Sequence, residues 1–102
     1  MQWAYTYWIE NTGEITGTVT MALNPTQSYL VEGFLSKKNG GDYAHVYIAE
    51  VCSQVSADQI DCGLNDEGSA GIATVLSSST SVTVGLRTTG GNHRAEGIVW
   101  QL

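Results

Sequence analysis

Tryptophan and tyrosine side chains offer the clearest chemistry in this sequence. The chain holds 3 Trp and 5 Tyr residues beside a single Phe. A sugar can stack the apolar C–H face of its ring on such a flat side chain, while neighbouring polar groups bond to the sugar hydroxyls. Most of these rings should fill the core, as large apolar side chains usually do. A ring that faces solvent is therefore a candidate for carbohydrate binding.

The first segment of the chain indicates which ring that is. Residues alternate there with a period of two, which places Trp3, Tyr5 and Tyr7 on one face and Trp8 on the other. The larger apolar set should be buried, so Trp3→Ala is expected to cost stability. Trp8 then faces outward, and the predicted ligand-binding residues are Trp8 and its two neighbours on that face, Thr6 and Glu10.

Residues 56–70 form the most acidic stretch, and carboxylate and amide oxygens on a loop suit calcium. The oxygens belong to Asp58, Asp61, Asn65, Asp66 and Glu67. Their spacing does not follow the EF-hand order, which needs acidic or amide side chains at alternate positions and a later Glu. We therefore expect a solvated loop that binds no metal, and the sequence carries no motif for another cofactor.

Catalysis has few candidates. His45 and His93 could each act as a general base, but the sequence has no glycine-flanked nucleophile elbow and no assignable Ser-His-Asp set. Glu32 and Glu50 could form the carboxylate pair of a glycosidase, although nothing in the sequence sets their separation. His45 alternates with tyrosines, which favours a buried structural histidine, and His93 follows two glycines, which favours a loop tip. We predict no catalytic residues and a protein that is not an enzyme.

The two cysteines bear on the cellular compartment. Cys52 and Cys62 flank a polar segment, and Gly63 follows the second. An even number and close spacing favour a disulfide that closes a short loop, and hence an oxidising compartment. The alternative is a pair of reduced, buried thiols in a cytosolic protein. Zinc is disfavoured, since the cysteines and the distant histidines match no ligand spacing. We expect the disulfide, and a secreted or cell-surface protein.

Charge excludes whole classes of partner. The formal net charge is −6, and only 4 residues are Lys or Arg. Nucleic acids and anionic membranes are both bound through clustered basic side chains, which this chain lacks. No apolar run approaches the roughly 20 residues of a transmembrane helix, and the start lacks the basic residues of a signal peptide. We expect no nucleic-acid partner and no transmembrane segment.

Hydrophobic periodicity is close to two along nearly the whole chain. Clusters of Gly, Asn or Pro separate about seven such segments, and the one from Tyr43 to Val55 is apolar on both faces, which predicts a central strand. The last segment places Trp100 on an apolar face, so Trp100→Ala is also expected to cost stability. We predict one domain over residues 1–102, an all-β antiparallel β-sandwich, with a small closed barrel as the alternative. Neighbouring strands are expected to pair as hairpins.

These features favour a non-catalytic recognition module that binds carbohydrate, and the composition is similar to that of small lectins. The main alternative is a structural or protein-binding subunit of an extracellular or viral assembly, or an inhibitor. Such a subunit could use an exposed edge strand, and self-association into a homo-oligomer would follow the same logic. The alternating segment 71–89 also fits a pore-forming hairpin, but any surface hairpin shows that alternation. A small enzyme is the remaining alternative.

Overall fold

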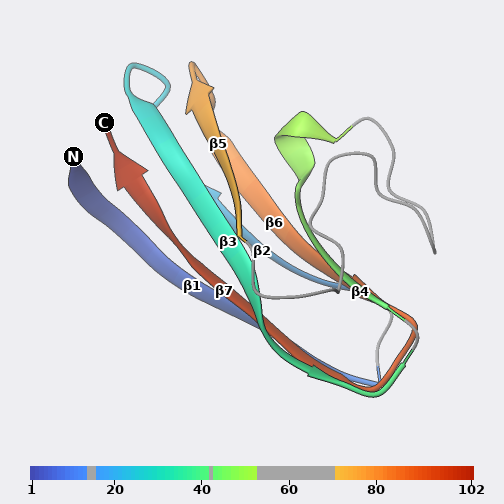
Figure 1. The fold of residues 1–102 in the computed structure, drawn as a ribbon. Helices are drawn as coiled ribbons and strands as arrows, with labels where there is room; N and C mark the ends of the chain where they lie inside the picture. Colours follow the sequence, from blue (N-terminus) through green and yellow to red (C-terminus); the bar gives the residue numbers. More distant parts are fainter. Residues whose placement is uncertain (14–15, 42, 53–70) are drawn as a thin grey trace.

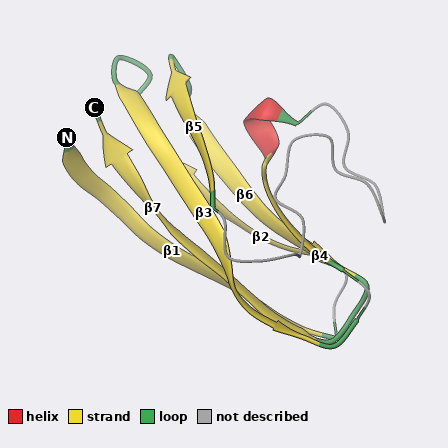
Figure 2. Cartoon of the chain, viewed as in Figure 1, coloured by secondary structure: helices red, strands yellow, loops and turns green. Residues whose placement is uncertain are grey.

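The computed structural model describes residues 1–13, 16–41, 43–52 and 71–102. These ranges hold seven strands and one short 3-10 helix (Figure 2). In chain order they are β1 (Gln2–Thr12), β2 (Thr16–Ala22), β3 (Ser28–Asn39), β4 (Ala44–Ile48), η1 (Ala49–Val51), β5 (Ile72–Ser77), β6 (Ser81–Thr88) and β7 (Asn92–Gln101). Within the described ranges, no helix is long and apolar enough to cross a membrane.

The strands form two antiparallel sheets packed face to face. One sheet has four strands in the order β1-β7-β3-β5, and the other has three in the order β2-β6-β4. Figure 1 shows the first sheet in front and the two chain ends side by side at one end of it. The predicted β-sandwich of about seven strands is therefore confirmed, and the alternative of a closed barrel is wrong.

The connections differ from the predicted hairpins. Consecutive strands among those described lie in opposite sheets, and pairing joins β1 to β7, β2 to β6 and β3 to β5. These nested pairs follow the path of one long hairpin rolled into two layers, which is the connectivity of a jelly-roll sandwich. The turn predicted at Asn24 and Pro25 does exist, closed by a hydrogen bond of 3.0 Å from Gln27 N to the Asn24 backbone oxygen, but it carries the chain from β2 to β3 in the other sheet. A turn sequence specifies a reversal of direction without specifying the partner strand.

The core lies between the two sheets. Alternate residues of each strand point inward, and many of them are fully buried aliphatic side chains, including Val31, Val46, Val82, Val84, Leu86 and Val99. Burial of one such side chain contributes roughly 1.5–3 kcal/mol, so this layer accounts for most of the stabilisation. Period-two sequences give this result because every second side chain leaves the strand on the same face.

β4 departs from the expected central strand. All five of its residues are buried, as the apolar pattern on both faces predicts. Among the described strands, however, β4 pairs only with β6 and lies at an edge of its sheet. Burial on both faces reports how a strand is covered, and it does not report how many neighbours the strand has.

The Tyr7 side chain lies over two glycines, Gly33 and Gly97, on the inner face of the four-stranded sheet. Its hydroxyl donates a hydrogen bond of 2.6 Å to the backbone oxygen of Glu32 in β3. A Cβ at either Gly33 or Gly97 would lie 2.5 Å from that hydroxyl oxygen. Burial, reinforced by the charge of Glu32, raises the pKa of Tyr7 well above its usual value, so the phenol stays protonated and can donate. The two glycines thus make room for a polar bond inside the sandwich.

Candidate functional site

Trp3 lies on the opposite face from the one expected. The register of β1 against β7 shifts between Trp3, which faces Trp100, and Tyr5, which faces Val99. An extra residue in one strand reverses the faces of everything before it. Trp3 is therefore 62% exposed, and its predicted place in the core is wrong, whereas Tyr7 is buried as expected.

All three tryptophans consequently share the outer face of the four-stranded sheet. Trp8 is 59% exposed on β1, as its alternation with Thr6 and Glu10 predicts. Trp100 is half-buried on β7, and its assignment to the core is also wrong, because its ring lies on this outer face beside Glu32. We call this surface the tryptophan face. It holds Trp3, Thr6, Trp8, Glu10, Leu30, Glu32, Phe34, Ala73, Val75, Arg94, Glu96, Ile98 and Trp100.

Strand register arranges the side chains of this face in rows. The first row runs Trp3, Trp100, Leu30, Val75 across the four strands, and it is wholly apolar. Trp8 belongs to a later row, because it faces Glu96, four residues before Trp100 on β7. At about 3.3 Å per residue, the two rows lie about 13 Å apart. Aromatic rings therefore stand at two separated levels of one open surface.

Hydrogen bonds fix the rings of the first row. The indole N–H of Trp3 donates to the Thr6 hydroxyl over 2.9 Å. The indole N–H of Trp100 donates to Oε1 of Glu32 over 2.7 Å. Each polar partner keeps further capacity: the Thr6 hydroxyl can still donate, and the Glu32 carboxylate has a second oxygen that can accept. The arrangement offers flat apolar area with hydrogen-bonding groups at its margins.

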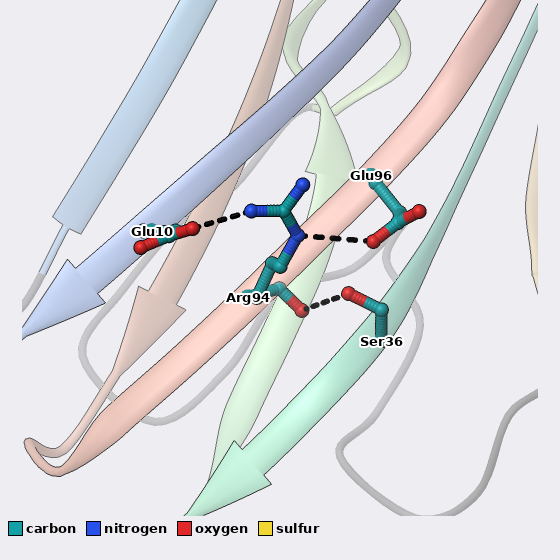
Figure 3. A network of polar contacts seen from close by, with 4 residues as sticks. All are labelled: Glu10, Ser36, Arg94 and Glu96. Atoms are coloured by element: carbon teal, nitrogen blue, oxygen red, sulfur yellow. Dashed lines mark hydrogen bonds and ion pairs between the residues drawn. The ribbon is translucent and has the colours of Figure 1, made fainter.

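Arg94 organises the second level. Its guanidinium bonds to Glu10 on β1 and, over 3.0 Å, to Glu96 on its own strand (Figure 3). Its central carbon also lies 5.5 Å from the centroid of the Trp8 ring, within the range of a cation–π contact. The Ser36 hydroxyl donates to the Arg94 backbone oxygen over 3.2 Å. Trp8 is thereby backed by a charged group that is itself held in place.

The same contacts shift the ionisation of these side chains. The Ser36 hydroxyl and the Arg94 guanidinium hold the pKa of Glu96 below its usual value. Hydrogen bonding to Glu96 and then to Glu10 raises the pKa of Arg94. Both groups are solvent-exposed, so the energy involved is small. The Arg94–Glu96 pair stays charged at neutral pH and weakens as the pH falls through the lowered pKa of Glu96.

Shallow hollows lie along and beside the tryptophan face. One of about 110 Å³, between β3 and β7, is lined by Glu32, Phe34, Gly97 and Ile98. Another of about 270 Å³ lies where β1 ends and β7 begins, and it is lined by Glu10, Asn11, Thr12, Lys37, Asn92, His93 and Arg94. A third of about 240 Å³, between the edges of β1 and β2, is bordered by Tyr5, Thr6, Tyr7, Trp8, Val19 and Met21. Trp8 thus borders the third hollow, and Arg94, which it contacts, lines the second.

The residues considered for catalysis are not brought together. His93 is a buried residue of β7 and not a loop tip, with Nε2 2.6 Å from the Gly90 backbone oxygen. His45 is buried in β4, as the sequence predicts. Glu32 lies on the tryptophan face, whereas Glu50 lies in η1 and accepts a hydrogen bond of 2.9 Å from Thr83 N in the other sheet. The proposed carboxylate pair is therefore split between the two layers.

The acidic loop and one of the two cysteines lie outside the described residues. Cys52 follows η1 and is half-buried, while Cys62 and residues 56–70 belong to the part that the structure does not describe. The pairing of Cys52 with Cys62 and the absence of a calcium site both stay predictions. Within the described ranges, no group of three or more His, Cys, Asp or Glu residues could hold a metal ion.

We expect Cys52 and Cys62 to form a disulfide in natively produced protein. Closing so short a loop should contribute about 2–3 kcal/mol by limiting the unfolded chain. The measurement is the intact mass after alkylation under non-reducing conditions, with a reduced sample as the control. Two alkylated thiols in the non-reduced sample would contradict the pairing.

The fold and the exposed tryptophans define the protein as a jelly-roll β-sandwich with an aromatic sheet face. No protein-family model matches the chain, and comparison with curated proteins finds no significant relative. The argument for function therefore rests on the geometry of the tryptophan face.

Proposed function

We propose that this protein is a non-catalytic, lectin-like recognition module that binds carbohydrate on the tryptophan face. The observation that carries the proposal is that all 3 Trp residues of the chain lie on one outer sheet face, two of them more than half exposed. Exposed tryptophan is costly to keep in water and marks a surface that is covered in use. A rigid sheet also holds the rings at fixed positions.

The polar groups around the rings suit a sugar. Trp100 lies beside Glu32, and Trp3 lies beside Thr6. Glu10 is paired with Arg94, which contacts the Trp8 ring. Carboxylates and hydroxyls at the margin of a flat apolar area can receive and supply hydrogen bonds to sugar hydroxyls, while the rings receive the C–H faces. Of the predicted set, Trp8, Thr6 and Glu10 all lie on this face. A secreted or cell-surface location belongs to the proposal and follows from the expected disulfide.

A glycan array probed with labelled protein tests the proposal. The wild-type protein should bind a defined group of glycans, and the double variant Trp3→Ala/Trp8→Ala should lose that binding while it remains folded. Val51→Ala is the matched control, because Val51 is 45% exposed in η1, away from the tryptophan face. Absence of any glycan signal from folded wild-type protein would overturn the proposal, as would full retention of binding by the double variant.

A protein partner is the second candidate, and the first row of the face favours it. Leu30 and Val75 extend the apolar strip from the tryptophans to the far edge of the sheet, and Val75 is 57% exposed. Apolar strips of this extent also occur where subunits meet, including copies of one chain. Light scattering over a range of concentrations separates the candidates. A dimer that Val75→Glu dissociates would favour the protein interface, and a monomer would favour the glycan.

A further inference from the structure

We infer that the ligand of the tryptophan face is an uncharged polysaccharide bound along its length, and that the carboxylate of Glu32 sets this preference. The inference rests on the proposed function and names its substrate class. Three observations carry it: the two levels of aromatic rings, the small size of the hollows described on this face, and the position of the charges.

The spacing of the rings favours a chain over a single sugar. The Trp3–Trp100 row and Trp8 are about 13 Å apart, which exceeds the length of one sugar ring. The hollows described along and beside the face measure about 110, 240 and 270 Å³. Pockets that enclose a small ligand are usually about 300–1,000 Å³, so this surface does not enclose a chain end. A linear glycan can instead lie across the open sheet and contact both levels.

The charges favour a neutral chain. Glu32 bonds to Trp100, so its carboxylate stands at the first aromatic row, and no described cation pairs with it there. At the second level, Arg94 is shared between Glu10 and Glu96. Lys37 lines the hollow where β1 ends and β7 begins. A uronate, sialate or sulfate stacked on Trp100 would therefore meet a like charge at close range. Hydroxyl groups would find an acceptor in the same place.

Matched polymers test the inference. Hydroxyethylcellulose, galactomannan and xyloglucan are immobilised, each beside the same polymer with part of its primary alcohols oxidised to carboxylates, and binding is followed by biolayer interferometry. The wild-type protein should bind at least one neutral polymer, and should bind its oxidised form about fivefold more weakly or worse, as expected for one close like-charge contact. High salt should reduce the difference, because it screens exposed charges.

Glu32→Gln isolates the carboxylate. The amide oxygen can still accept the bond from Trp100, but the amide nitrogen cannot accept from a sugar hydroxyl. The variant should therefore bind the neutral polymer more weakly than the wild type does, while the preference for the neutral over the oxidised polymer largely disappears. Glu50→Gln is the matched control, because it makes the same change in net charge on the other layer and its amide can still accept from Thr83 N.

Each outcome separates the inference from the function on which it rests. Equal wild-type binding to both forms of a polymer would overturn the preference for neutral chains and leave carbohydrate binding intact. A penalty that Glu32→Gln leaves unchanged would overturn the role of Glu32. Tight binding of single sugars that chains do not improve would overturn binding along the chain. Failure to bind any polymer would overturn the inference, and a glycan array without signal would remove the proposed function as well.

Discussion

Replacing Gly97 by alanine should destabilise the protein by about 3 kcal/mol or more, the largest effect we expect from removal or addition of one methyl group. A Cβ at this position would lie 1.9 Å from the backbone oxygen of Glu32 and 2.5 Å from the Tyr7 hydroxyl oxygen. The first obstacle is backbone, which cannot move aside without opening the pairing of β3 with β7. The second is a buried phenol whose hydrogen bond would be lost at the same time.

Urea unfolding followed by tryptophan fluorescence measures this effect. Thermal unfolding is a second readout, in which a domain of this size should lose about 4–8 °C of melting temperature for each kcal/mol of destabilisation. Gly33→Ala is the matched control, because its new Cβ would meet the same Tyr7 hydroxyl oxygen at 2.5 Å, while its next nearest neighbours are side-chain carbons at 3.6 and 3.8 Å. Its cost should therefore be clearly smaller. Equal costs for the two variants would show that backbone contact at Gly97 is not the cause.

The second large effect is on binding. Trp8→Ala should weaken affinity for a bound glycan by about 1–3 kcal/mol, or five- to 150-fold, by analogy with the stacking of bases on aromatic side chains. Its unfolding free energy should change by less than about 0.5 kcal/mol, because the ring is 59% exposed and does not belong to the core between the sheets. Titration calorimetry with the best glycan of the array measures the affinity.

Trp8→Phe separates stacking from other causes. Phenylalanine keeps a flat ring in the same place, so this variant should retain most of the affinity that Trp8→Ala loses. Trp3→Ala should likewise leave stability nearly unchanged, in contrast to the expectation from alternation alone. An affinity that neither Trp8 variant alters would show that the glycan binds elsewhere on the molecule.

Sequence alternation predicted the strands, the sandwich and the exposure of Trp8, because each depends on local periodicity and on burial of one face. It failed at Trp3, where the register shift before Tyr5 reverses the face of the chain. Alanine at position 4 gives no signal of a bulge, so the pattern alone could not reveal it. The rule that predicted Trp8 correctly thus placed Trp3 wrongly five residues earlier.

The sequence could not predict contacts between strands that lie far apart along the chain, and the reason is different. Glu10 was predicted from its alternation with Trp8, but its partner Arg94 lies at the opposite end of the chain. Glu32 and Trp100 are likewise far apart in sequence and bonded in the fold. Such pairs depend on which strands become neighbours, and that follows from the rolled-up connectivity. His93 illustrates the same limit, since two preceding glycines suggested a loop although the residue belongs to β7.

The nested strand order also has a consequence for how the protein folds as it is synthesised. β1 is synthesised before the other described strands and finds its only described sheet partner in β7, so it must wait for the last of them. Loop closure over nearly the whole chain is entropically costly, and domains dominated by such distant pairings fold slowly, in milliseconds to seconds. During that interval the tryptophans of β1 stand on an unpaired strand, which is the state most open to aggregation or chaperone capture. The surface that would serve recognition is therefore the last part of the molecule to be completed.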